Sequence, residues 1–265
     1  MQVSIVQYDI TWEDKTASQA YMNAMLDASP PHEDGFVLVP ELCDVGFSMN
    51  LDSIVDGQTE EWARQRALRD RTWIQYGFAS RDEDGRGLNC ATIATPSGTL
   101  HDTYTKVHPF SHGLESRHYV GGGRLVLVEV GDLLVCPLIC YDLRFPELWR
   151  LARRAGAQAF AIGASWPAVR QDHWRSLLIA RAIENQAFVF GCNRCGSDPH
   201  LEYAGGSMII DPTGTVLAEA DDTPTLLQAD IDPSAVDRWR DEFRCQDDVH
   251  EAFLGTITVV RSNPA

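Results

Sequence analysis

The segment that decides the fold is Leu134-Val-Cys-Pro-Leu-Ile-Cys140-Tyr-Asp-Leu-Arg-Phe-Pro146-Glu-Leu-Trp149. It begins with a short apolar run that is typical of a buried strand, and Pro146 is typical of the first turn of a helix. Cys140 lies between the two. The strand would fix the position of the thiol, and the backbone N–H groups of the next turn would point toward whatever the sulfur attacks. The segment therefore predicts a nucleophilic cysteine at a strand–helix junction.

Outward from this segment, strand-like and helix-like stretches alternate along the chain. We expect helices near residues 16–28, 60–76, 146–156 and 171–185, and a further helix that begins at Asp232. The expected strands cover residues 3–7, 35–39, 77–81, 90–95, 100–106, 125–130, 133–140, 159–164, 187–192, 206–210, 215–220 and 226–230. The turns at 95–99 and 211–215 predict hairpins. No Gly-x-Gly-x-x-Gly motif follows the first expected strand, which favours a single α/β domain with mixed sheets over a nucleotide-binding fold.

The composition excludes several classes of protein. The chain of 265 residues has 38 acidic residues against 22 Lys and Arg, which gives a formal net charge of −16. A surface of this charge repels nucleic acids and anionic membranes, so neither is expected as a partner. The hydrophobic content of 44% is sufficient for a large core and excludes global disorder.

The N-terminal residues and the cysteines predict a cytoplasmic protein. The first eight residues read as a short strand without a basic leader, so we expect no signal peptide. Apolar runs such as Leu133–Ile139 are much shorter than the ~20 residues that a membrane helix needs. The seven cysteines are odd in number and mostly lie in apolar stretches, which favours free thiols over disulfides. Cys192 and Cys195 form a Cys-x-x-Cys pair, but no second pair or histidine set completes a metal site.

Two further residues stand in strand-end positions like that of Cys140. They are Glu41, in Val-Pro-Glu41, and Lys106, in Tyr-Thr-Lys106-Val-His. Amide hydrolysis needs a nucleophile, a base, stabilisation of the oxyanion and a proton for the leaving amine. Cys140, Glu41, Lys106 and the backbone N–H of Tyr141 would supply this set, because a carboxylate can move the proton and an ammonium can hold the oxyanion. These residues predict a cysteine-dependent hydrolase of amide bonds.

These motifs resemble those of the nitrilase superfamily of carbon–nitrogen hydrolases. The resemblance rests on Pro40-Glu41, Tyr104-Thr-Lys106-Val-His108-Pro-Phe110 and Ile139-Cys140-Tyr-Asp-Leu-Arg-Phe-Pro146, in the required order. Trp166-Pro, Arg181-Ala-Ile-Glu-Asn-Gln186 and Asp211-Pro-Thr-Gly214 extend it to about residues 2–245. It implies an α/β fold, namely an α-β-β-α sandwich of two mixed sheets flanked by helices. It also implies one carbon–nitrogen hydrolase domain over residues 1–265 and a homodimer formed by helix packing.

The resemblance also implies a role for each candidate residue. Glu41 would be the base, Cys140 the acylated nucleophile, and Lys106 with the Tyr141 N–H the oxyanion stabiliser. Glu115, in Gly-Leu-Glu115-Ser, matches the second glutamate of the family, which orients the lysine and the incoming water. The family uses no metal and no organic cofactor, so the implied partners are a small amide substrate and water.

Among the subfamilies, the omega-amidases are the most similar; they release ammonia from the terminal amide of 2-oxo dicarboxylic acid monoamides. The similarity rests on Val45-Gly-Phe47-Ser-Met49, the Cys140–Pro146 run, Ala164-Ser-Trp166-Pro and Gly191-Cys-Asn-Arg-Cys-Gly-Ser197-Asp. Phe47, Arg144 and Trp166 are the candidate substrate-binding residues. The loop at 111–119 matches no single substrate pattern. Deaminated glutathione, an N-carbamoyl amine or a nitrile therefore remain alternative substrates.

Three further alternatives are open. A Cys–His dyad is the mechanistic rival, with His108 as its best candidate, although we expect His108 to fasten a loop by hydrogen bonds. Arg144 could bind a substrate carboxylate, but an arginine at this position more often forms a salt bridge with a nearby acid such as Asp142 or Glu147. A non-catalytic binding protein on this fold is the rival from another class, yet it has no need to keep all the candidate catalytic residues.

Overall fold

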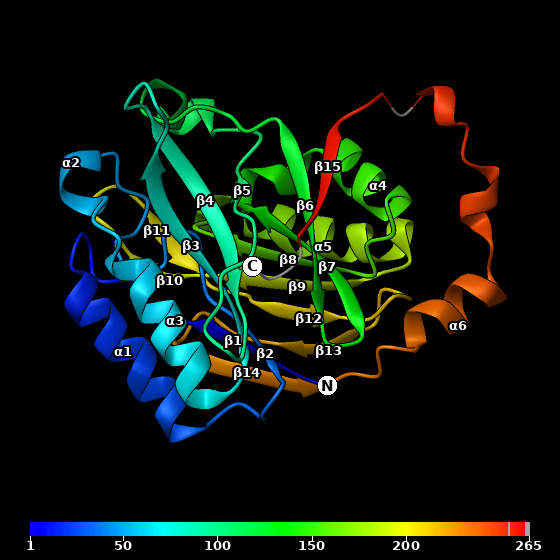
Figure 1. Ribbon diagram of the computed structural model, residues 1–265, viewed down its shortest axis with the longest axis horizontal. Coiled ribbons are helices and arrows are strands. Elements are labelled where there is room, and N and C mark those ends of the chain that lie inside the picture. The colour runs from blue at the N-terminus through cyan, green and yellow to red at the C-terminus, as the bar shows by residue number, and fades with distance from the viewer. Residues whose placement is uncertain (254, 263–265) are drawn as a thin grey trace.

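The computed structural model describes residues 1–253 and 255–262. Two sheets pack face to face, with helices on both outer sides (Figure 1). This α-β-β-α sandwich confirms the predicted fold class. Within the described part of the chain, every helix is too short or too polar to span a bilayer.

The first sheet contains six strands. In spatial order these are β14 (Thr225–Asp230), β1 (Gln2–Gln7), β2 (Phe36–Leu38), β3 (Trp73–Arg81), β4 (Gly87–Ala94) and β5 (Tyr104–Thr105). Strands β1, β2 and β3 are parallel to one another, and the other pairs are antiparallel. The helices α1 (Lys15–Ala28) and α3 (Gln58–Asp70) lie against this sheet. The parallel strands therefore end at the same edge, where Glu41 follows β2.

The second sheet contains seven strands. In spatial order these are β13 (Val216–Glu219), β12 (Met208–Ile210), β9 (Phe188–Asn193), β8 (Ala159–Ala164), β7 (Leu133–Ile139), β6 (Arg124–Val130) and β15 (Thr258–Ser262). Strands β7, β8 and β9 are parallel, so that Cys140 and Ser165 follow neighbouring strand ends. The helices α4 (Pro146–Arg154) and α5 (Gln171–Asn185) cover this sheet.

The remaining elements are short. They are α2 (Leu51–Ile54), α6 (Ala235–Glu242), the two-stranded β10 (Cys195–Ser197) and β11 (Glu202–Ala204), and 3₁₀ turns at Ser111–Gly113, Glu115–Arg117, Cys140–Arg144, Ala168–Arg170, Cys245–Asp248 and Glu251–Phe253. The turn that begins at Cys140 matters most, because it carries the candidate nucleophile.

The main core lies between the two sheets. The rings of Phe36 on β2 and Phe190 on β9 are 5.9 Å apart, and Ile5, Leu38 and Ile162 belong to the same fully buried cluster. Burial of this apolar surface is the main force that holds the sheets together. The sandwich thereby brings the end of β2 close to the ends of β7 and β8.

The structure corrects one predicted helix. The sequence predicts a helix over residues 60–76, but α3 ends at Asp70 and β3 already begins at Trp73. Arg71 adopts a left-handed φ of 53°, the conformation that commonly ends a helix. That position usually carries Gly or Asn, so the sequence lacked the usual stop signal. The predicted strand at 100–106 is also shorter, since only β5 and a single bridge at Leu100 form.

Two glycines allow the strands of both sheets to approach the backbone of Glu41. A Cβ atom at Gly163 would lie 2.9 Å from the carbonyl oxygen of Val39 and 3.0 Å from the amide nitrogen of Glu41. A Cβ at Gly77 would lie 2.7 Å from the amide nitrogen of Leu42. The distances of 2.9 Å at Gly163 and 2.7 Å at Gly77 are too short for a real Cβ contact with a backbone atom, so these positions require glycine.

We expect Gly163→Ala to displace the backbone at Glu41 and to lower the free energy of unfolding by about 1–3 kcal/mol, as overpacking of a dense core does. Urea unfolding measures this change. Gly123→Ala is the matched control, because a Cβ there meets no atom within 4 Å. Equal stability of the two variants would contradict the close approach at Gly163.

Candidate active site

Glu41, Lys106 and Glu115 form a buried cluster of charged groups. Lys106 Nζ lies 2.7 Å from Glu41 Oε1 and 2.8 Å from Glu115 Oε2, and none of the three side chains is more than 1% exposed. The sequence could not establish whether Glu115 contacts Lys106. The structure places the two groups in direct contact.

Asn89 on β4 joins the two carboxylates, and the sequence analysis missed it. Its Nδ2 donates to Glu41 Oε1 at 2.8 Å and to Glu115 Oε1 at 2.7 Å. The backbone carbonyl oxygen of Asn89 accepts the backbone N–H of Lys106 at 2.9 Å. The only sequence signal was a polar residue inside the apolar strand Leu-Asn89-Cys-Ala-Thr-Ile. Asn89 thus contacts all three members of the cluster and fixes their relative positions.

Backbone groups complete the hydrogen bonds of the carboxylates. The N–H of Ser165, at the end of β8, donates to Glu41 Oε2 at 3.0 Å, and the N–H of Phe110 donates to Glu115 Oε2. Buried carboxylates are stable only when such donors satisfy them. Glu41 therefore joins the end of β2 in one sheet to the end of β8 in the other.

The cluster holds Lys106 in its charged form. Burial alone would lower the pKa of Lys106, but the negative charges of Glu115 and Glu41 outweigh burial and raise this pKa well above its ordinary value. Lys106 is therefore a fixed positive charge at neutral pH.

Cys140 follows β7 with an unusual backbone conformation. Its φ is 44°, in a region that non-glycine residues rarely adopt, and strain of this kind is common at functional sites. Burial raises the pKa of the thiol well above its ordinary value; the charges of Glu41 and Glu115 raise it further, while Lys106 opposes them. The sulfur is therefore a neutral thiol in the free protein at neutral pH.

Asp142 anchors the turn that carries Cys140. Its Oδ2 accepts the Tyr104 hydroxyl at 2.7 Å, and its Oδ1 lies 3.0 Å from both the backbone nitrogen and Nδ1 of His108. The His108 ring stacks on Phe145 with centroids 3.6 Å apart. These contacts confirm the prediction that His108 fastens a loop. The hydrogen bonds join His108 to Asp142, so they give no support to a Cys–His dyad.

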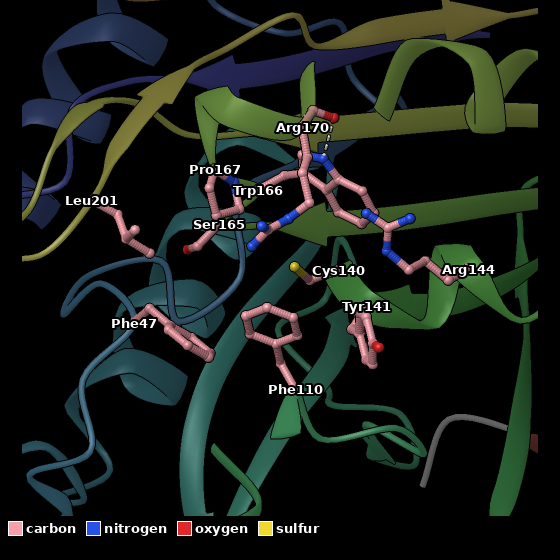
Figure 2. Close-up of a pocket in the computed structure, with 10 residues that line it drawn as sticks. All are labelled: Phe47, Phe110, Cys140, Tyr141, Arg144, Ser165, Trp166, Pro167, Arg170 and Leu201. Carbon is pink, nitrogen blue, oxygen red and sulfur yellow. Dashed lines mark hydrogen bonds between the residues drawn. The ribbon is translucent and has the colours of Figure 1, made fainter. Parts of the chain in front are cut away.

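A pocket opens beside the sulfur of Cys140 (Figure 2). The three predicted substrate-binding residues, Phe47, Arg144 and Trp166, all line it. The other lining residues are Phe110, Tyr141, Ser165, Pro167, Arg170 and Leu201. Of these, sequence reasoning had considered only the backbone of Tyr141. The walls are mostly apolar but include two guanidinium groups, which suits a short ligand with an anionic group.

The prediction that Arg144 forms a salt bridge with Asp142 or Glu147 is wrong. Its guanidinium lies 4.6 Å from the ring centroid of Trp166, and its Nη2 is 3.2 Å from Nδ1 of His173. No carboxylate of the described residues pairs with it. Asp142 is engaged by the contacts given above, and the side chain of Glu147 is exposed. Arg144 is therefore half-buried in the pocket without a counter-charge.

The cysteines and the acidic residues form no metal centre in the described part of the chain. All seven cysteines are free thiols, and no group of three or more His, Cys, Asp or Glu side chains there is arranged to hold an ion. Cys192 and Cys195 are both buried.

Comparison with known protein families assigns the chain to a family. The family model described as carbon-nitrogen hydrolase matches residues 2–241. The chain belongs to the carbon–nitrogen hydrolase family. This assignment confirms the resemblance that the motifs around Glu41, Lys106 and Cys140 predicted.

Curated relatives and solved structures are similar to this chain over nearly its full length. The 2-oxoglutaramate amidase of Bacillus subtilis (strain 168) is 35% identical over 94% of this chain and 97% of the relative. The omega-amidase YafV of Escherichia coli (strain K12) is 34% identical over 96% of this chain and 98% of the relative. A CN-hydrolase superfamily protein from Xanthomonas campestris, crystallised with an arsenic adduct in its active site, is 32% identical with a TM-score of 0.88, over 96% of this chain and 99% of that one.

We expect Glu41→Gln to lower the pKa of Cys140, because the substitution removes one of the negative charges that raise it. The rate of alkylation of Cys140 by iodoacetamide, followed by peptide mass spectrometry across pH, reports this pKa. For the wild type, the alkylation rate should still increase with pH at pH values above about 8.5, the pKa of an ordinary thiol. For Glu41→Gln, the same increase should occur at lower pH. Glu219→Gln, at a partly exposed carboxylate of β13, is the control. An unchanged curve for Glu41→Gln would contradict the electrostatic coupling.

Proposed function

We propose that this protein is a cysteine-dependent amidase that hydrolyses the terminal amide of a small carboxylate, as omega-amidases do, and releases ammonia through a thioester. The observation that carries the proposal is the buried contact of Lys106 with Glu41 and Glu115 beside the strained Cys140. Burying three charged groups is costly, and well-packed apolar residues would stabilise the fold as well or better. The cluster is therefore better explained by chemistry than by stability.

Acylation begins with the neutral thiol. Glu41 takes the proton of Cys140 as the sulfur attacks the amide carbon, so that the C–S bond forms and the carbonyl electrons move to oxygen. Lys106 and the backbone N–H of Tyr141 stabilise this oxyanion. When the intermediate collapses, the C–N bond breaks, the proton held by Glu41 passes to nitrogen, and ammonia leaves.

Deacylation uses the same groups with water as the nucleophile. Glu41 takes a proton from water as its oxygen adds to the thioester carbon. Collapse then breaks the C–S bond, releases the carboxylic acid and returns the proton to sulfur. Glu115, which accepts hydrogen bonds from Lys106, keeps the ammonium aimed at the oxyanion and orients the water.

The pocket supports a small substrate that carries a carboxylate. Arg144 is half-buried without a carboxylate partner among the described residues, and it lines the same pocket as the sulfur. The names of the relatives, 2-oxoglutaramate amidase and omega-amidase, support the same class of substrate. We therefore favour the terminal amide of a short 2-oxo dicarboxylic acid.

Cys140-dependent release of ammonia tests this function. We expect the wild-type protein to release ammonia from 2-oxoglutaramate and 2-oxosuccinamate much faster than from glutamine, asparagine, an N-carbamoyl amine, deaminated glutathione or a simple nitrile. Cys140→Ala should abolish release, because the thioester cannot form. Cys136→Ala, at a buried thiol within β7, is the control and should retain activity. Full turnover by Cys140→Ala would exclude the thioester mechanism.

We also propose that the protein works in the cytoplasm as a homodimer. The seven free cysteines are those of a protein in a reducing compartment. Val169, just before α5, and Ile183, within it, are 82% and 52% exposed and offer apolar surface to a second copy. Light scattering on the purified protein should give twice the mass of the chain, and a monomer at micromolar concentration would contradict the dimer.

A further inference from the structure

A second arginine, Arg170, reaches the pocket. It ends the 3₁₀ turn Ala168–Arg170, immediately before α5, and it lines the pocket together with Cys140 and Arg144. Figure 2 shows both arginine side chains entering the pocket on the side of Trp166, opposite Phe110. Within residues 1–253 and 255–262, the guanidinium of Arg170 has no salt bridge and donates no hydrogen bond.

Two contacts fix the position of Arg170 without using its side-chain donors. Trp166 Nε1 donates to the carbonyl oxygen of Arg170 at 2.8 Å, which holds the backbone of the turn. The guanidinium carbon lies 5.5 Å from the ring centroid of Phe110, which is a cation–π distance. An arginine has five N–H donors in a planar fork. All of them remain available to a ligand.

The positive charges of Arg144 and Arg170 have no acidic partner among the described residues. The chain has 38 acidic residues, yet none of those described pairs with Arg144 or Arg170. Both guanidinium groups line the same pocket. Burial lowers the pKa of Arg144, Tyr141 opposes this effect, and the positive charge of Arg170 lowers the pKa further. A carboxylate in the pocket would supply the missing negative charge and relieve the repulsion.

We propose that Arg170 is a substrate-binding residue, which together with Arg144 clamps the free carboxylate of the substrate and makes the pocket selective for short dicarboxylic acid monoamides over neutral amides. The proposal rests on the amidase function given above. The amide carbon must lie next to the sulfur of Cys140 while the carboxylate reaches the two guanidinium groups. Because Cys140, Arg144 and Arg170 all line one pocket, the chain between the amide and the carboxylate is short.

Substitution of each arginine tests the clamp. We expect Arg170→Gln to raise KM for 2-oxoglutaramate about 10- to 100-fold, the usual cost of losing a charge-assisted hydrogen bond. Its kcat should change little, because Arg170 does not touch the reacting atoms. The KM for butyramide, which has no carboxylate, should stay within about twofold of the wild-type value. Arg170→Lys should recover part of the loss, since it keeps the charge but not the fork.

Arg175→Gln is the matched control. Arg175 lies on α5 close to Arg170 in sequence, but it is exposed and paired with Glu219 at 2.8 Å. Arg175→Gln should leave KM and kcat unchanged for both 2-oxoglutaramate and butyramide. If Arg170→Gln raised KM equally for 2-oxoglutaramate and for butyramide, Arg170 would have a structural role and the proposal would be overturned.

A binding measurement separates this proposal from the amidase function itself. Glutarate carries carboxylates but no amide, so it should protect Cys140 of the wild-type protein from iodoacetamide without any turnover. Arg170→Gln should need about 10-fold more glutarate for the same protection. If no amide is hydrolysed but glutarate protects in this Arg170-dependent way, the proposed function fails and the carboxylate site stands. Identical protection of the wild type and the variant would exclude the clamp.

Discussion

The contact of one buried ammonium with two buried carboxylates is the constraint on which the rest of the site depends. Lys106, Glu41 and Glu115 come from three separate strand ends or loops, and each would be expensive to bury alone. Their geometry must therefore be held by groups that cannot move independently. Asn89 and the backbone N–H of Ser165 provide this support, one from each sheet. The packing of the two sheets is thus a condition for the cluster.

Burial and the excess of negative charge in this cluster together determine the protonation state of the nucleophile. Many reactive cysteines are activated as thiolates by a nearby cation. Here burial, together with the two carboxylates, outweighs Lys106, so the pKa of Cys140 is raised. A neutral thiol in the free protein is a poor nucleophile, and it acquires reactivity only when its proton moves to Glu41 as the C–S bond forms. The same arrangement limits unwanted alkylation or oxidation of Cys140 in the absence of substrate.

The sequence predicted those parts of the site that lie in continuous motifs. Glu41, Lys106 and Cys140 each follow an apolar strand, and the structure brings them together, although their catalytic roles stay predictions. Asn89 and Arg170 were missed because their immediate neighbours are ordinary for a strand and a turn. The salt bridge of Arg144 was wrong because Asp142 is engaged by Tyr104, 38 residues earlier in the chain, and by His108. The end of α3 was misplaced because the left-handed position carries an arginine, whose side chain gives no local signal. In each case the deciding contact or conformation came from tertiary structure.

An acidic protein that binds an anionic substrate needs a local source of positive potential. With a formal charge of −16, the surface as a whole repels a dicarboxylic acid monoamide at long range. At physiological ionic strength, however, exposed charges are screened over a Debye length of about 8 Å, whereas partly buried charges are screened much less. Arg144 and Arg170 lie half-buried in a mostly apolar pocket, where the dielectric constant is lower than in water and their attraction for a carboxylate is stronger. The pocket can therefore select an anion that the surface of the protein repels, provided that both guanidinium groups remain free of acidic partners.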